Sequence, residues 1–144
     1  MKYDDAAWHA GDEFPRDLPP EAGATHAALF LAWALCADLG GDYHVIDSAE
    51  DLERLRARQL TPVQYFLAVC DGQLTDEDFG PEGNGFAIAY YQQGVSGYLG
   101  DYQEYLAKGL PTEYHVPGGW TSYDKLKPVL DRRLANWRRG RTAP

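Results

Sequence analysis

Apolar residues recur along this chain with helical spacing, and short turns rich in glycine, proline and acidic residues separate the apolar stretches. The longest apolar stretch, residues 27–37, contains no charged or strongly polar side chain. A helix that is apolar on nearly every side has to lie in the interior of a packed domain. The pattern therefore predicts a central helix over about residues 24–39, which ends at the glycine pair 40–41, where glycine can adopt a left-handed conformation.

Two further helices are marked by residues that favour helix starts. Ser48 precedes a polar helix over residues 48–59, with acidic residues early and arginines late, an order that complements the helix dipole. Thr61 precedes Pro62 at a first helical position, and apolar side chains follow at i, i+3, i+4 and i+7 over residues 61–72.

The remaining segments give weaker patterns. Residues 43–46 suggest a short extended piece, and residues 101–108 a short aromatic helix. Residues 84–93 fit either a helix or a strand, and their small alanines favour a helix. The last segment begins near residue 121, and we expect Pro128 in the first turn of its helix, because proline deeper inside would kink it.

These elements predict an all-α (mainly α) protein, a compact single domain over residues 1–144. Five to six helices would surround the central apolar helix, with at most one short pair of strands. The acidic arm of residues 1–22 is too aromatic for a solvated tail, so we expect it to pack on the body. Residues 124–144 would form a basic C-terminal helix and tail.

Charge is distributed unevenly. The net charge is −9, with 20 acidic and 6 basic residues over positions 1–123 and 2 acidic and 7 basic residues over positions 124–144. An acidic body repels phosphates, so we expect a basic protein as partner and no nucleic acid. The longest apolar run is too short to span a bilayer, and the N-terminus lacks the apolar segment of a secretory signal. We therefore expect a cytoplasmic protein, monomeric or homodimeric, without membrane contact.

No local motif predicts a metal or a cofactor. If Gly72 is placed at position 6 of a calcium-binding loop, Leu67 and Val69 occupy positions that require oxygen ligands. The four histidines are too scattered along the chain to share a local ligand motif, and the two cysteines are expected as buried, reduced thiols. No nucleophile elbow or phosphate-binding loop is present either.

His9 and His26 could form a site together if the arm folds back. The acids Asp4 and Asp5 would then lie near them, and a His–Asp couple can perform acid–base chemistry. A buried imidazole with satisfied hydrogen bonds is the ordinary alternative at the start of an apolar helix. We therefore expect no catalytic residue and keep an enzyme that uses His9 and His26 as an alternative.

Tyrosines alternate with carboxylates in the second half of the chain. Aromatic side chains supply contact area in protein interfaces, and carboxylates steer a basic partner. The alternative is that these tyrosines pack the core with only their hydroxyls exposed. The candidate partner-binding residues are Asp76, Glu77, Asp78, Asp101, Tyr102 and Glu104.

Several segments resemble a family of small bacterial proteins of unknown function. They are MKYDDAAWH, LPPEAGATHAALFLAW, LTDEDF, FAIAYY, YLGDYQEYL and WTSYDKLKPVLDRRLANW. Members start with an MKYDDASWH-like arm and a PEAGATH-like helix start, and this chain differs at Ala7. Some of them resemble immunity proteins of polymorphic or contact-delivered toxins, but the resemblance assigns no functional residue.

The sequence thus favours a protein-binding module. The specific hypothesis is an immunity protein that neutralises a cognate bacterial toxin by stoichiometric binding through an acidic, aromatic surface. We expect this toxin to be basic, because many toxins act on nucleic acids. The alternative is a housekeeping adaptor or structural protein whose acidic surface serves solubility alone.

Overall fold

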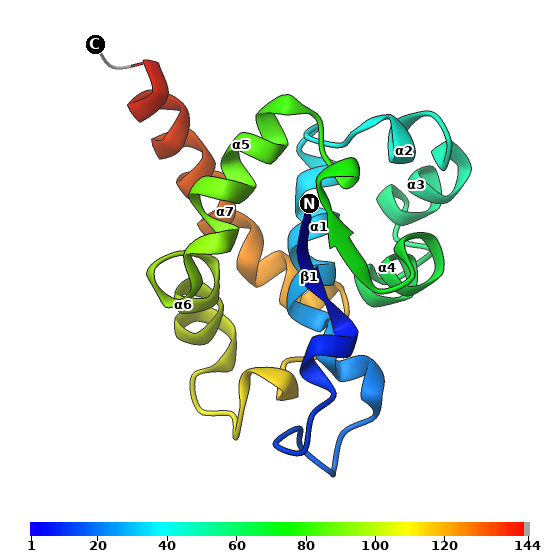
Figure 1. The fold of residues 1–144 in the computed structure, drawn as a ribbon, viewed down its shortest axis with the longest axis vertical. Coiled ribbons are helices and arrows are strands. Elements are labelled where there is room, and N and C mark those ends of the chain that lie inside the picture. Colours follow the sequence, from blue (N-terminus) through cyan, green and yellow to red (C-terminus); the bar gives the residue numbers. More distant parts are fainter. Residues whose placement is uncertain (143–144) are drawn as a thin grey trace.

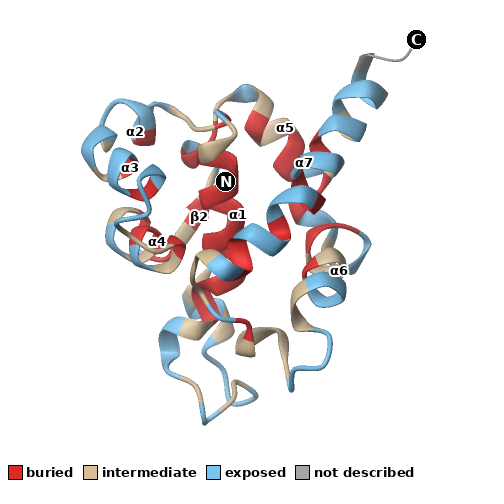
Figure 2. Cartoon of the chain, turned by 180° about the vertical axis from the view of Figure 1, so that it is seen from behind, coloured by how far each residue is buried: buried red, intermediate tan, exposed pale blue. Residues whose placement is uncertain are grey.

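Helix α1, Thr25–Cys36, runs through the middle of the protein with other helices on several sides (Figure 1). The computed structural model describes residues 1–142. Every α1 side chain from Thr25 to Leu35 is buried, and exposed residues lie mainly on the outer helices (Figure 2). Both the central apolar helix and the all-α fold class are therefore confirmed.

Short helices, turns and one pair of strands make up the rest of the described chain. The other α-helices are α2 Asp42–Val45, α3 Ala49–Arg56, α4 Pro62–Cys70, α5 Pro81–Ala89, α6 Tyr98–Tyr102 and α7 Trp120–Thr142. The 3-10 turns are η1 Ala6–His9, η2 Pro20–Ala24, η3 Asp76–Asp78, η4 Tyr91–Ser96 and η6 Glu113–His115, and the π-helical turn η5 Gln103–Ala107 continues α6. The strands are β1 Lys2–Asp5 and β2 Gln73–Thr75.

The N-terminal arm lies against the body through strand pairing and side-chain contacts. Strand β1 pairs antiparallel with β2, with Asp4 opposite Leu74. Further along the arm, the Asp17 carboxylate lies 2.9 Å from the imidazole of His115 in η6. These contacts bring the arm next to both β2 and η6, and so place its titratable side chains near those of the body.

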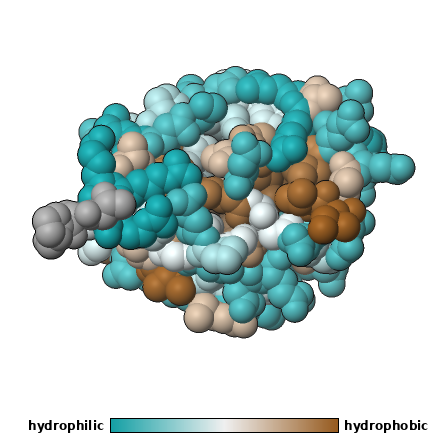
Figure 3. Space-filling model, turned by 90° about the horizontal axis from the view of Figure 1, so that it is seen from above, coloured by the Kyte–Doolittle hydropathy of each residue, from teal (hydrophilic) through white to brown (hydrophobic). Residues whose placement is uncertain are grey.

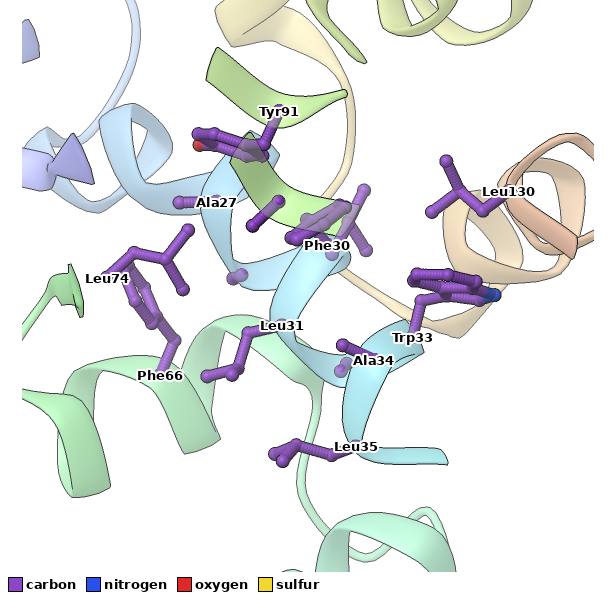
Figure 4. Packing of buried hydrophobic residues seen from close by; sticks show 14 of the residues in the cluster. Ala27, Phe30, Leu31, Trp33, Ala34, Leu35, Phe66, Leu74, Tyr91 and Leu130 are labelled. Atoms are coloured by element: carbon purple, nitrogen blue, oxygen red, sulfur yellow. The ribbon is translucent and has the colours of Figure 1, made fainter. Parts of the chain in front are cut away.

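Two sides of α1 are covered by hydrophobic side chains, and each side receives both aromatic and aliphatic residues. Leu74 and Phe66 lie on one side, and Leu130 lies with Trp33 on the other (Figure 4). The ring of Phe30 is 4.9 Å from that of Tyr91, centroid to centroid, within the range of favourable aromatic pairs. The packing thus joins strands, short helices and α7 into one core.

The segment after α1 differs from the sequence prediction. Residues 43–46 were expected to be extended, but Asp42–Val45 forms the short helix α2. The residue in the left-handed conformation is Asp38, with φ of 61°, and neither glycine at 40–41 has positive φ. Gly41 is required for space instead, because a Cβ atom there would lie 2.9 Å from the carbonyl oxygens of Glu77 and Phe79.

Two proline-containing segments also differ. Helix α7 begins at Trp120, so Pro128 lies inside it and does not mark its first turn. Glycine and proline are typical of turns between helices, but in the segment from Gly80 to Gly85 Pro81 occupies the first position of helix α5 and the helix continues through the glycines. The helix favoured for the following residues is confirmed as far as Ala89.

Arginines of α7 pair with carboxylates of the acidic body. Arg133 makes two hydrogen bonds to Asp101, and Arg138 and Arg141 both contact Glu82. Bonds from these two arginines hold the pKa of Glu82 at about 2. The basic helix is thus held by the body over the described residues, while the end of the expected tail, residues 143–144, lies outside them.

Over residues 1–142, no helix combines the length and the apolar character that crossing a bilayer requires.

Candidate functional site

Helix α2 and turn η3 lie side by side because backbone hydrogen bonds connect the residues just before α2 to η3. The amide of Gly41 donates to the carbonyl oxygen of Asp78 at 3.1 Å, and Gly40 forms an isolated bridge with Phe79. The close approach of the η3 backbone at Gly41 leaves no room for a side chain. Residues 42–47 and 76–78, which are far apart in the sequence, therefore form one region.

This region exposes apolar side chains next to carboxylates. Tyr43, Val45 and Ile46 expose 39%, 50% and 65% of their surface. From above, hydrophobic surface gathers towards the side of the molecule that carries α2, among hydrophilic residues (Figure 3). Contiguous apolar surface with a polar rim is typical of interaction sites. The α2–η3 surface consists of Tyr43, Val45, Ile46, Asp42, Asp47, Asp76 and Glu77.

A buried cluster of titratable side chains lies beneath this surface. His44, in α2, is fully buried, and its Nε2 lies 2.7 Å from Oδ1 of Asp78 in η3. The Sγ of Cys70, the last residue of α4, is 3.5 Å from the same oxygen and 3.8 Å from His44 Nε2. These three residues, the His44–Cys70–Asp78 cluster, thus connect α2, α4 and η3.

Both histidine nitrogens and both carboxylate oxygens in this cluster have partners. The hydroxyl of Tyr65 lies 2.5 Å from His44 Nδ1, and the backbone amide of Thr75 donates to Asp78 Oδ2 at 2.7 Å. Burial, followed by the charge of Asp78, raises the pKa of the Cys70 thiol far above its usual value. In the absence of a bound cation the thiol is therefore protonated and donates to Asp78.

The cluster borders a cavity of about 200 Å³. Its lining residues are Tyr43, Cys70, Gln73, Thr75, Glu77 and Asp78. The cavity therefore connects the buried thiol and carboxylate to the exposed α2–η3 surface.

A second cluster forms where the arm meets α1. The Asp4 carboxylate accepts hydrogen bonds at 2.8 Å from Nε2 of His9 and from Nε2 of His26. The hydroxyl of Tyr91 and the backbone amide of Asp5 also donate to it. Burial by itself would raise the pKa of Asp4, but the hydrogen bonds from His26 and His9 outweigh it, and the pKa lies well below its usual value.

His9 is the accessible member of this arm cluster. Its Nδ1 lies 2.8 Å from the Tyr114 hydroxyl, and it lines a cavity of about 360 Å³ together with Trp8, Tyr114 and acidic residues. The juxtaposition of His9, His26 and Asp4 agrees with what a folded-back arm implies. The Asp5 side chain takes no part, since its carboxylate accepts hydrogen bonds from Lys2 and from the amide of Ala7.

The six candidate partner-binding residues differ in how far the structure exposes them. Asp76 and Glu77 are exposed on the α2–η3 surface, and Glu104 is exposed on η5 beside Lys108. Asp78 and Tyr102 are 3% and 0% exposed, so neither side chain belongs to the surface of this structure.

The Asp101 carboxylate is not available to a partner either, because it accepts hydrogen bonds from Arg133 and from the Tyr90 hydroxyl. Helix α6 lies well away from α2 (Figure 1). The candidates near residue 77 and those near residue 103 therefore do not form one surface.

Sequence reasoning missed His44 and Cys70 as neighbours of Asp78. Cys70 and Asp78 are joined by the turn at Gly72 and by the short strand β2, and the Thr75 cap suggests that the chain reverses there. Nothing in the local spacing indicates His44, because the contact between α2 and η3 spans 34 positions.

The fold and these two clusters define the class of protein: a mainly α-helical domain whose N-terminal arm is pinned by a buried carboxylate–histidine network. The chain belongs to the family described as a domain of unknown function, DUF7832, which matches residues 2–116. The match covers the arm and both clusters and ends before α7. Neither the curated proteins nor the solved structures include a match.

Proposed function

We propose that this protein binds a basic protein, a cognate bacterial toxin, and neutralises it by stoichiometric binding through the α2–η3 surface. The proposal rests on one observation: Tyr43, Val45 and Ile46 are exposed together between carboxylates. The sequence resemblance to toxin immunity proteins supports the same role. Such a partner would be met in the cytoplasm.

The α2–η3 surface has the composition of a binding site for a basic protein. Apolar side chains at its centre would exclude water on binding, and its carboxylates would lie at the rim. Asp42, Asp47 and Glu77 are exposed, and none of them forms an ion pair with another residue of the stretch 1–142. Their charge, which is part of the net −14 over residues 1–123, would accelerate association with a basic partner.

Backbone contacts hold this surface in place. The Gly41–Asp78 hydrogen bond and the buried His44–Asp78 contact fix α2 against η3 on its inner side. A surface ordered before binding loses less conformational entropy when a partner docks. Tyr43 is further held by a hydrogen bond from its hydroxyl to the carbonyl oxygen of Val69.

The test is a titration of the purified protein with the product of the adjacent gene, followed by calorimetry. A double variant, Val45→Lys with Ile46→Lys, places two positive charges at the centre of the surface. We expect affinity for a basic partner to fall by at least about a hundredfold, which corresponds to about 2.7 kcal/mol. The same variant should no longer relieve the toxicity of that product in co-expressing cells.

Val95→Lys is the matched control, because Val95 exposes 70% of its surface on η4, near α6 and away from α2. It should bind and protect like the unaltered protein. Equal affinity of the double variant and the control would remove the α2–η3 surface from the interface. A neighbouring product that is neither bound nor toxic would favour the adaptor hypothesis.

The arm cluster supports a second candidate function, acid–base catalysis in the cavity beside His9. The Tyr114 hydroxyl contacts His9 Nδ1, and Asp4 orients the same ring through Nε2. A hydroxyl, a base and an orienting carboxylate in this order form a recurrent catalytic arrangement. Hydrolysis of a panel of activated esters by the unaltered protein and by His9→Gln tests it, and equal rates would reject it.

A further inference from the structure

We propose that the His44–Cys70–Asp78 cluster is a zinc site, with His44 Nε2, Cys70 Sγ and Asp78 Oδ1 as three protein ligands and water as the fourth. The proposal is independent of the partner-binding role. An imidazole nitrogen, a thiolate and a carboxylate oxygen are the ligand types that Zn²⁺ selects.

The distances between the three ligand atoms fit a tetrahedral zinc ion. Ordinary zinc–ligand bond lengths place such atoms about 3.3 to 3.6 Å apart. Cys70 Sγ is 3.5 Å from Asp78 Oδ1 and 3.8 Å from His44 Nε2. The His44–Asp78 distance of 2.7 Å is that of a direct hydrogen bond, and it would open by roughly 0.6 Å when a metal replaces the proton.

Neighbouring groups orient two of the ligands. Metal-bound histidines usually hold their second nitrogen in a hydrogen bond, and ligating carboxylates are themselves hydrogen-bonded. The Tyr65 hydroxyl occupies this position at His44 Nδ1, and the Thr75 amide occupies it at Asp78 Oδ2. Neither contact uses the atoms that would bind zinc.

The adjoining cavity supplies the open coordination position. Cys70 and Asp78 both line this space of about 200 Å³, several times the share of volume of one water molecule. A metal ion could therefore enter from the side of Tyr43 and Glu77 and keep a water ligand there.

The arm cluster is a weaker site for zinc although it also contains two imidazoles and a carboxylate. Each oxygen of Asp4 already accepts two hydrogen bonds, including those of Tyr91 and the Asp5 amide, which a metal would not replace. It also lacks a thiol, whereas Asp78 Oδ1 faces only atoms that can themselves bind zinc.

Zinc binding at the His44–Cys70–Asp78 cluster releases one proton. The Cys70 thiol loses its proton to solvent, and the zinc–sulfur bond takes its place. The hydrogen on His44 Nε2 moves to Nδ1, which then donates it in a hydrogen bond to the Tyr65 oxygen, and zinc binds the freed Nε2. With Asp78 as carboxylate and Cys70 as thiolate, the two negative charges balance Zn²⁺.

The test titrates chelator-treated full-length protein with Co²⁺ and Zn²⁺. We expect one Co²⁺ per chain with a thiolate-to-cobalt charge-transfer absorption, which Zn²⁺ displaces. Calorimetry in buffers of different ionisation enthalpy should give release of one proton per Zn²⁺. Absence of saturable binding by the unaltered protein would overturn the proposal.

Three variants locate the site. Cys70→Ser should abolish the charge-transfer absorption, while Cys36→Ser, at the other free cysteine, and His9→Gln, in the arm cluster, should retain it. Absorption that survives Cys70→Ser would refute the assignment. If Cys70→Ser does not fold, alkylation of the unaltered protein decides: zinc should slow modification of Cys70 and leave that of Cys36 unchanged, and equal rates would count against the site.

Discussion

The Asp4 carboxylate lies 2.8 Å from the imidazole Nε2 of His26 and so fastens strand β1 to the first turn of the central helix. The two residues are 22 positions apart, and both are buried. A buried carboxylate is stable only when its charge is paired and its lone pairs are filled. The donors His9, His26 and Tyr91 meet this requirement, so the arm is held by electrostatics as well as by strand pairing.

Asp4→Asn should destabilise the fold, because the amide cannot accept hydrogen bonds on both of its terminal atoms and the negative charge is lost. We expect the free energy of unfolding in urea at neutral pH to fall by about 3 kcal/mol. Asp38→Asn is the control, since the Asp38 side chain is 90% exposed and asparagine tolerates its left-handed conformation. A loss as large for Asp38→Asn would contradict the role given to Asp4.

The stabilisation by Asp4 should depend on pH in the acid range. Its pKa is lower in the folded protein than in the unfolded chain, where it is about 3.9. The contribution is therefore complete above the unfolded value and is lost as pH falls through the folded value. Urea unfolding between about pH 6 and pH 2 should show the difference between unaltered protein and Asp4→Asn shrinking with falling pH. A constant difference would contradict this.

Tyr102→Phe should raise stability or leave it unchanged. The Tyr102 hydroxyl is buried and has no hydrogen-bond partner among the described residues. On folding it therefore gives up its hydrogen bonds to water and gains none in return. Removing it should increase the free energy of unfolding by up to about 1 kcal/mol. Tyr98→Phe is the contrast, because the Tyr98 hydroxyl donates to the carbonyl oxygen of His26. Its loss should lower the free energy of unfolding by about 1 to 2 kcal/mol. Thermal unfolding of both variants measures the two effects.

Thr61→Ala should weaken the start of α4. The Thr61 hydroxyl accepts from the Gln64 amide, and the Gln64 side chain accepts from the Thr61 amide, which forms a capping box. Loss of the cap should cost about 1 kcal/mol in chemical unfolding. Ser48→Ala should cost about 0.5 kcal/mol or less, because Ser48 makes no capping hydrogen bond at the start of α3. Equal losses would show that the Thr61 cap is not the cause.

Gly41→Ala should separate α2 from η3. Its methyl group would lie 2.9 Å from two carbonyl oxygens of the η3 segment, and the backbone has to move to admit it. Overpacking of this kind costs about 1 to 3 kcal/mol. Gly11→Ala, where no atom lies within 4 Å of the added methyl group, should change stability by less than about 0.5 kcal/mol. Thermal unfolding of the two variants side by side distinguishes steric contact from a general effect of replacing glycine.

The capping residues show how far local sequence rules reach. Thr61 and Ser48 both have the side chain of an N-cap, and helices do begin at Pro62 and Ala49. Only Thr61 makes the capping bonds, because the backbone at Ser48 does not adopt the extended conformation that would direct its hydroxyl to the helix amides. Residue type thus predicts where a helix starts more reliably than which bond holds it.

The candidate site was predictable only in part. Asp76, Glu77 and Asp78 were all candidates for partner binding, but only Asp76 and Glu77 are exposed, whereas Asp78 turns inward to His44. An acidic run gives no sign of which member is buried, because that depends on a histidine from a distant segment. Tyr102 is buried for a similar reason: its ring lies 5.7 Å from that of Tyr98 in the core beside α1.

The sequence by itself determined the central helix, since an uninterrupted apolar segment of helical length can be stable only when it is buried on all sides. It also determined the α4 start and the mainly α-helical class, because these follow from local spacing and capping. Only the tertiary structure decided that Asp4 meets His9 and His26 and that His44 meets Cys70 and Asp78. Such contacts join residues that no local periodicity relates, and they form only when strand pairing and the close approach at Gly41 bring distant backbone segments together.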